Sequence, residues 1–97
     1  MTEKPIELHV DLEVDPAKAD ALVDTFHRVF EPTIRKQPGF VSVALLRAPS
    51  GYRLVISFET EEQRKTWVGT ADHQRVWPQM EANLTGSKFA AMLWQKL

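Results

Sequence analysis

The chain has 97 residues and a mass of 11.1 kDa, the size of one domain with one hydrophobic core. A formal net charge of −1 gives no reason to expect nucleic acid or an anionic membrane as a partner. Cysteine is absent, which excludes disulfides, thiolate nucleophiles and metal centres built on cysteine. No apolar run approaches the length of a membrane-spanning helix, and residues 1–5 have no signal-peptide core. We expect a soluble, cytoplasmic protein with a flexible tail over residues 1–5 and a single domain over residues 6–97.

The first half of the chain predicts a strand followed by a helix. Residues 6–14 alternate strictly between apolar and polar side chains, the pattern of a strand with one face in the core. Asp15 and Pro16 have the form of a helix cap followed by proline at the first helical position. Apolar residues then recur at helical spacing up to Phe30. Pro32 lacks a backbone donor, so we expect the helix to end or kink near Phe30, before a further turn through Ile34.

The second half predicts a hairpin, a second helix and a last strand. Residues 40–47 and 52–59 flank a Pro-Ser-Gly turn and read as an antiparallel pair. Thr60 and Gln63 have the spacing of a capping box at the start of a helix. We expect residues 69–72 to interrupt that helix, Leu84 to continue its apolar face and Gly86 to follow its end. Residues 88–95 complete the order βαββαβ.

This order is typical of the α+β ferredoxin-like fold, in which a four-stranded antiparallel sheet carries two helices on one face. The last three strands have apolar residues on both faces, although two helices cover only one. On the second strand, for example, Phe40, Ala44 and Leu46 alternate with Val41, Val43 and Leu45. An uncovered face of this kind is unusually apolar for a monomer. We therefore expect a homodimer packed sheet against sheet, with Trp94, Met92 and Val55 at its interface.

The strongest candidate for a functional site is on the second helix. His73 and Trp77 fall on the inward, apolar face of that helix, and Trp67 lies one short segment upstream. We expect these residues to line a pocket between sheet and helices, flanked by Phe26, Phe30 and Phe58. Apolar walls with one or two polar groups suit a small aromatic ligand. A histidine there could move a proton at neutral pH or bind a metal or haem iron, unless it is a core residue bonded to a backbone carbonyl.

The remaining motifs point to no other chemistry. His9 lies on the polar face of the first strand, either as a metal or proton site or as a satisfied polar group at a dimer edge. His27 falls off the apolar stripe of the first helix, and we expect it to be exposed. The chain has no phosphate-binding loop, no dinucleotide fingerprint and no supported Ser-His-Asp triad. Gly51 and Tyr52 faintly echo an RNA-recognition strand, but the acidic first strand argues against RNA. We expect no metal and no nucleic acid.

The ordered set of elements resembles the antibiotic biosynthesis monooxygenase (ABM) family over about residues 6–95. The resemblance is carried by Gln-Pro-Gly-Phe at residues 37–40, by the strand sequence of residues 52–60, and by the helix with Trp67 and His73. It implies a dimeric α/β barrel of two ferredoxin-like protomers. It also implies oxidation of anthrone-type aromatics by molecular oxygen without a cofactor, or, in another branch, binding and degradation of haem.

The residues that the resemblance assigns to catalysis are largely replaced. Phe58 stands where the anthrone-oxidising enzymes have a tryptophan, and Leu54 stands where they have an asparagine. Trp67 matches the helix tryptophan of the haem-degrading branch. Trp77 falls at the position of that branch's haem-ligating histidine and cannot bind iron. The strand-one asparagine of that branch aligns near His9.

Together these observations predict a cofactor-independent monooxygenase that acts on a small aromatic or quinol-type substrate. In this interpretation His73 accepts the proton, Trp67, Trp77 and Phe58 form walls, and no cofactor is bound. The alternative is a non-catalytic small-molecule-binding or stress-related protein of the same fold. Haem binding or degradation is a third hypothesis.

Overall fold

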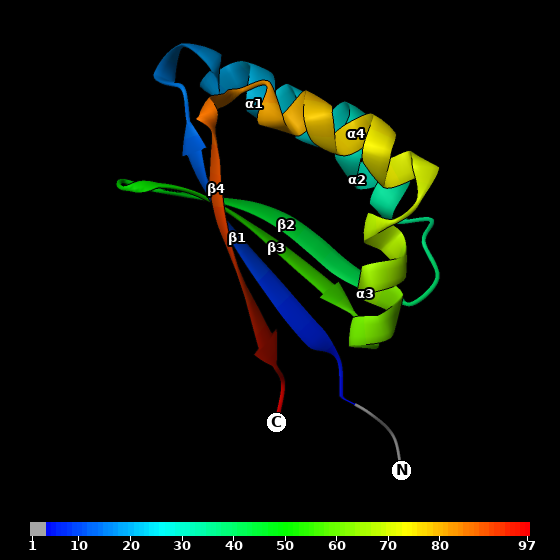
Figure 1. The fold of residues 1–97 in the computed structure, drawn as a ribbon. Helices are drawn as coiled ribbons and strands as arrows, with labels where there is room; N and C mark the ends of the chain where they lie inside the picture. Colours follow the sequence, from blue (N-terminus) through cyan, green and yellow to red (C-terminus); the bar gives the residue numbers. More distant parts are fainter. Residues whose placement is uncertain (1–3) are drawn as a thin grey trace.

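The computed structural model describes residues 4–97; of the predicted tail, residues 1–3 lie outside the described part. Its elements are β1 (Ile6–Val14), η1 (Pro16–Lys18), α1 (Ala19–Thr25), η2 (Phe26–Phe30), α2 (Glu31–Ile34), β2 (Phe40–Ala48), β3 (Gly51–Phe58), α3 (Glu61–Val68), α4 (Ala71–Glu81) and β4 (Leu84–Gln95). The strands form one antiparallel sheet in the order β2-β3-β1-β4. All helices lie on one side of this sheet (Figure 1). The predicted ferredoxin-like fold is confirmed.

The first helix continues through Pro32. Its two α segments, α1 and α2, are connected by one π turn, η2. Asp15 caps the start by accepting a hydrogen bond from the Ala17 N–H at 3.0 Å. At η2 the N–H of Glu31 donates to the carbonyl of Phe26, one residue further back than in an α-helix. Pro32 thereby falls in the first turn of α2, where a missing N–H is tolerated. The predicted irregularity is therefore this π turn, and the helix does not end until Ile34.

A bulge in β2 corrects the predicted faces of that strand. Phe40 pairs with Phe58, but Ser42 pairs with Ser57, so one extra residue of β2 lies between these two pairs. The extra residue reverses the alternation. Phe40 therefore packs against the core together with Val43 and Leu45, and its predicted placement with Ala44 and Leu46 is wrong.

The break between α3 and α4 covers only residues 69–70 of the predicted 69–72, because α4 already begins at Ala71, and α4 ends earlier than predicted. Thr60 caps α3 through the N–H of Gln63, and α4 ends at Glu81. Leu84 is the first residue of β4 and pairs with Val14, so its assignment to the helix is wrong. The carbonyl of Asn83 accepts from the N–H of Asp15 at 3.1 Å, which draws the chain back to β1. Gly86 does not follow a helix end; it lies within β4, where the register with β1 shifts.

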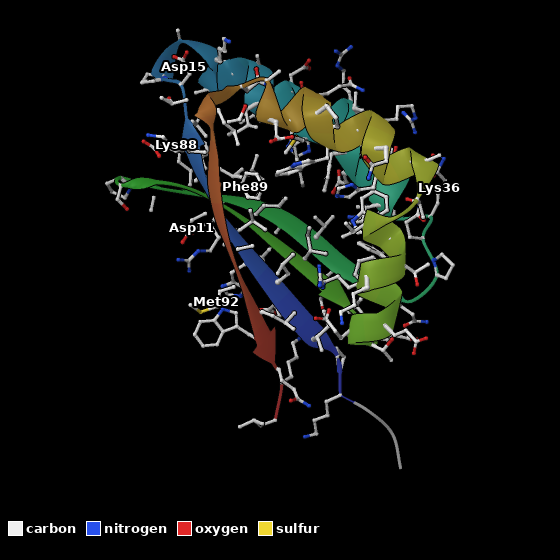
Figure 2. The ribbon with its side chains drawn as sticks, in the orientation of Figure 1. Asp11, Asp15, Lys36, Lys88, Phe89 and Met92 are labelled. Carbon is white, nitrogen blue, oxygen red and sulfur yellow. The ribbon has the colours of Figure 1, made fainter. Side chains whose placement is uncertain are left out.

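The two faces of the sheet have different environments. Side chains toward the helices form the core, which includes Val10, Leu54 and Phe58. On the other face, the row Ala44, Val55, His9, Met92 runs in register across all four strands. Figure 2 shows Asp11 and Met92 on the side away from the helices. Met92 and Trp94 are more than half exposed, which leaves apolar surface on this open sheet face.

Within residues 4–97, no helix has both the length and the apolar character that crossing a membrane requires.

The core predicts a large difference between two leucine truncations. Leu22 of α1 is fully buried, whereas Leu97 is almost fully exposed. We expect Leu22→Ala to lower the free energy of unfolding by about 2–5 kcal/mol, because it removes buried apolar surface and leaves a cavity. Leu97→Ala should change it by less than about 0.5 kcal/mol. Urea denaturation of both variants measures this difference, and equal losses would contradict the assigned core.

Candidate functional site

A cavity of about 230 Å³ lies between the sheet and helices α3 and α4. It is lined by Leu8, Val10, Phe30, Leu54, Ile56, Arg64, Trp67, Val68, His73, Trp77, Phe89 and Ala91. The strand residues alternate along β1, β3 and β4, so every second side chain forms the floor. Arg64 and His73 are the polar side chains of this lining. The cavity therefore offers apolar walls, one group that can exchange a proton (His73) and one that can donate hydrogen bonds (Arg64).

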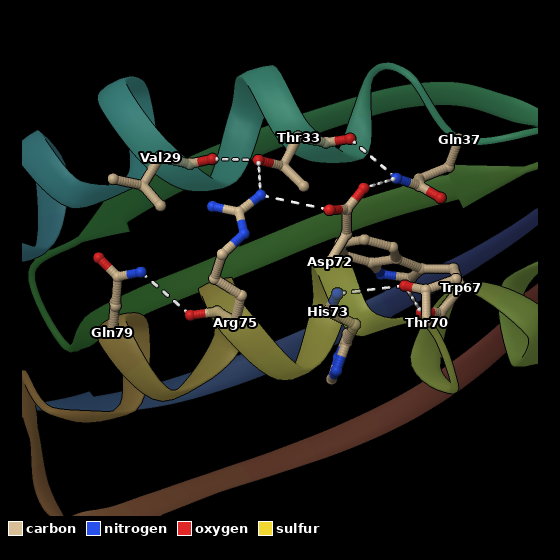
Figure 3. A network of polar contacts seen from close by, with 9 residues as sticks. All are labelled: Val29, Thr33, Gln37, Trp67, Thr70, Asp72, His73, Arg75 and Gln79. Carbon is tan, nitrogen blue, oxygen red and sulfur yellow. Dashed lines mark hydrogen bonds and ion pairs between the residues drawn. The ribbon is translucent and has the colours of Figure 1, made fainter.

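Thr70 holds the two helices that carry the site in a fixed relation. Its hydroxyl donates to the carbonyl of Trp67 at 2.7 Å, and its oxygen accepts from the N–H of His73 at 3.1 Å. The two rings consequently meet edge to face, with centroids 5.0 Å apart and an interplanar angle of 80°. Figure 3 shows Thr70 between Trp67 and His73, with the His73 ring on the side of α4 that faces the sheet.

His73 is a neutral imidazole with an unused hydrogen-bonding group. Its Nδ1 is buried, and no donor or acceptor among residues 4–97 lies within hydrogen-bond distance of it. The alternative in which a backbone carbonyl binds this ring is therefore not observed within the described part of the chain. Burial lowers the pKa of His73 below its ordinary value, because it disfavours the charged ring. The neutral form can accept a proton at physiological pH.

Aromatic rings surround the imidazole. The Trp77 ring stacks on His73, with centroids 6.3 Å apart and an interplanar angle of 21°. Trp77 also contacts Phe89 of β4 edge to face at 5.2 Å, which joins α4 to the edge strand. Phe30 lies between the two tryptophans, 6.1 Å from Trp67 and 6.3 Å from Trp77. The wall around His73 is therefore largely aromatic.

The structure brings four of the six predicted site residues together. His73, Trp67, Trp77 and Phe30 line the cavity, whereas Phe26 and Phe58 do not. Phe26 packs behind Phe30, with ring centroids 6.2 Å apart. Phe58 is fully buried and packs edge to face on Phe40.

Sequence reasoning missed Arg64, Val68 and Phe89. Arg64 and Trp67 are three residues apart on α3, which places them on one helix face, and this spacing was the available signal. Val68 follows at the fourth position after Arg64 and belongs to the same face. Phe89 lies on β4, a strand with apolar residues on both faces, so no local signal distinguishes it from its neighbours.

A polar network fixes the opposite side of α4. Asp72 accepts from the Gln37 amide at 3.0 Å and from Arg75 at 3.3 Å (Figure 3). These partners, Gln37 first, hold the pKa of Asp72 below its ordinary value. Gln37 also donates to the carbonyl of Thr33 at 3.1 Å. The network ties α2 to α4 and leaves the cavity side of α4 free for His73.

The other two histidines lie away from the cavity. His9 is on the open sheet face, bonded to Glu7 at 2.7 Å, and this bond lowers the pKa of Glu7. His27 is largely exposed, as predicted, with Glu31 at 3.6 Å. Among residues 4–97 no three His, Asp or Glu side chains are grouped as metal ligands.

A wider groove of about 1120 Å³ lies by the β2–β3 turn and is lined partly by Asp11, Glu13, Arg47 and Lys88. Its lining carries charges of both signs and no histidine. It therefore lacks the neutral proton acceptor that the smaller cavity has.

The lowered pKa of His73 predicts a pH-dependent stability. As the pH falls from about 7.5 to 5.5, the unfolded chain gains a proton at this position before the folded protein does, so the free energy of unfolding decreases. His73→Gln removes this titration and should lose less stability over the same range. Urea denaturation at both pH values measures the difference. His27→Gln is the matched control and should follow the wild type; parallel curves for wild type and His73→Gln would contradict the prediction.

Comparison with known proteins places these observations in a family. The family model described as antibiotic biosynthesis monooxygenase matches residues 5–78. A proposed antibiotic biosynthesis monooxygenase from Bordetella bronchiseptica superposes with a TM-score of 0.87 at 19% identity, covering 98% of this chain and 99% of that one. SnoaB, a cofactor-independent oxygenase from Streptomyces nogalater, superposes with a TM-score of 0.81 at 18% identity, covering 96% and 93%.

A dimeric ferredoxin-like protein of unknown function from Jannaschia sp. CCS1 is also similar, with a TM-score of 0.79 at 13% identity, covering 95% of this chain and 99% of that one. No functionally curated protein matches the sequence. At these identities the solved structures show a shared fold. The family match over most of the chain shows that this chain belongs to the antibiotic biosynthesis monooxygenase family.

Proposed function

We propose that this protein is a cofactor-independent monooxygenase that oxidises a small aromatic or quinol-type substrate in the cavity between the sheet and α3–α4. The observation that carries the proposal is the neutral His73 imidazole with a free nitrogen in an otherwise apolar, aromatic cavity. Such a group can take a proton from an acidic substrate at neutral pH. The likeness to SnoaB, a cofactor-independent oxygenase, supports the same reaction class.

The chemistry begins with proton transfer. A ring C–H or O–H bond of the substrate breaks, the proton moves to His73, and the electron pair stays on the substrate. The resulting anion reduces molecular oxygen itself. For an activated methylene group the overall change converts CH2 and O2 into C=O and H2O, so the atoms balance without a cofactor. The protein supplies orientation and apolar walls that limit access of water.

The alternative is a binding protein without catalysis, and one observation favours it. The residues at the strand positions assigned to catalysis by family resemblance are Leu54 and Phe58, which bear no polar groups. Leu54 is part of the cavity floor, and Phe58 is outside the cavity lining. Haem ligation is not supported by Trp77, whose ring packs between His73 and Phe89.

Oxygen uptake separates the two functions. With a panel of hydroquinones and anthrones and no added cofactor, we expect the wild type to consume oxygen above the buffer rate. His73→Ala should reduce the rate by about 10²–10⁴-fold, because it removes the proton acceptor. His27→Ala is the control and should retain full activity, and circular dichroism verifies the fold of both variants. Equal rates in wild type and His73→Ala would remove His73 from the mechanism, and no uptake by the wild type would favour the binding protein.

We further propose that a second copy of this chain covers the open sheet face. That face presents Met92 and Trp94 to solvent at 59% and 51% exposure, with the partly buried Val55 between β1 and β2. The ferredoxin-like neighbour from Jannaschia is dimeric, which supports the same arrangement. The two prominent side chains come from β4, an edge strand, so the interface centres on β4 and β1.

Introducing a charged side chain on this apolar face should prevent formation of the dimer. Sedimentation equilibrium should give the wild type twice the 11.1 kDa chain mass. Trp94→Glu places a charge among apolar side chains, and we expect it to give a monomer at micromolar concentration. Val68→Glu, which alters an exposed apolar residue on α3, should remain dimeric. A monomeric wild type would overturn the proposed assembly.

A further inference from the structure

Among residues 4–97, Arg64 is the one charged side chain in the lining of the cavity. It projects from the same face of α3 as Trp67, and its side chain is only 18% exposed. Neither the family match nor the similar structures assign it a role. A guanidinium at the wall of an apolar cavity can serve only as one partner of a structural ion pair, or it can also bind the ligand. The number of its N–H donors that are left without a protein acceptor distinguishes these two roles.

Glu61 uses only part of that capacity. The Glu61 carboxylate accepts from Nε of Arg64 and, at 3.3 Å, from Nη2. A guanidinium has five N–H donors, so three remain, two on Nη1 and one on Nη2. Within residues 4–97 the guanidinium has hydrogen bonds to Glu61 alone. Glu61 therefore fixes the plane of the guanidinium, and the remaining donors are available to a ligand.

The charge balance of the pair limits the kind of ligand. Arg64 and Glu61 together are neutral, and burial keeps His73 neutral as well. A carboxylate ligand would therefore add an uncompensated negative charge to a half-buried site, which is costly. A carbonyl or quinoid oxygen adds no charge and can accept the free N–H groups of Arg64.

The volume limits the ligand further. The cavity of about 230 Å³ is smaller than the roughly 300–1,000 Å³ of sites for drug-sized ligands. An apolar cavity of about 150 Å³ already accommodates benzene. One or two fused rings are therefore the matching size.

We infer that Arg64 stabilises the oxyanion formed when His73 deprotonates the substrate, and that the substrate is a one- or two-ring aromatic with a hydroxyl group conjugated to a carbonyl-type oxygen. This inference rests on the proposed function of the cavity. In the step, the O–H bond breaks, the proton moves to His73, and the electron pair is delocalised through the ring to the oxygen at Arg64. Donors already oriented toward that oxygen stabilise the charge as it develops.

The test uses a probe that cannot be confused with turnover. Para-hydroxyacetophenone has one ring, a hydroxyl group and a conjugated carbonyl, and its phenolate absorbs at longer wavelength than the phenol. Binding is measured without oxygen by quenching of tryptophan fluorescence, and ionisation of the bound probe by difference absorbance across pH. Phenol lacks the carbonyl, acetophenone lacks the hydroxyl, and benzoate has a carboxylate.

We expect the wild type to bind para-hydroxyacetophenone more tightly than the three comparison compounds. The bound probe should ionise about one pH unit or more below the free probe, because its proton passes to His73 and the phenolate–imidazolium pair leaves the net charge of the site unchanged. Arg64→Met should raise the Kd of the probe about tenfold and abolish that pKa decrease. Arg64→Lys keeps the positive charge but lacks the planar set of N–H donors of the guanidinium. It should therefore recover only part of the affinity and of the pKa decrease. Arg28→Met is the matched control, because Arg28 forms an exposed ion pair with Asp24 on the first helix; it should behave as wild type.

Glu61→Gln tests the charge argument. It leaves the Arg64 charge without its partner, so binding of benzoate should strengthen relative to the probe. Three results would overturn the inference: no saturable binding of the probe to the wild type, tighter binding of benzoate than of the probe, or an unchanged Kd and pKa in both Arg64 variants. Failure of the proposed function looks different. In that case the Arg64-dependent binding and pKa decrease persist, while no substrate supports oxygen uptake.

Discussion

The two hydrogen bonds of the Thr70 hydroxyl are the constraint on which the site depends. Thr70 occupies the break between α3 and α4, donates to the last turn of one helix and caps the first turn of the other. These two hydrogen bonds fix the edge-to-face contact of Trp67 with His73. It also sets the direction of α4, so that Asp72 faces α2 while His73 faces the sheet. One side of α4 is thereby anchored to the first helix, and the other side faces the cavity.

Much of this arrangement could be predicted from the sequence, because local signals decide it. Alternation along β1 and the caps at Asp15 and Thr60 act within a few residues, and the structure agrees with them. The errors occur where distant partners override local pattern. Leu84 continues the helical spacing of the apolar residues of α4, but it pairs with Val14 of β1 and is therefore the first residue of β4. The face of Phe40 is decided by the bulge that comes directly after it, which depends on the pairing of β2 with β3 and cannot be detected by a period-two count.

The candidate site could be predicted to a lesser extent, for the same reason. His73, Trp67 and Trp77 are recognisable because they share an inward helical face, and the structure places them around one cavity. Phe58 was expected in the wall of this cavity, but its ring packs instead on the ring of Phe40 in β2. Arg64 escaped notice because a basic residue beside a glutamate on a helix is typical of a solvated surface pair. Only the position of α3 over the sheet brings Arg64 to the cavity wall.

The distribution of polar groups suggests how this member differs from the pattern its family resemblance implies. That pattern has polar or hydrogen-bonding side chains on the strand positions held here by Leu54 and Phe58, both fully buried. In this chain both polar cavity groups, His73 and Arg64, come from the helices. In the proposed mechanism, a floor of alternating apolar residues sets shape alone, while His73 on α4 accepts the proton and Arg64 on α3 stabilises the charge. Thr70 joins these two helices, so in this mechanism the ligand must present its acidic hydrogen to one group and its acceptor oxygen to the other at the same time.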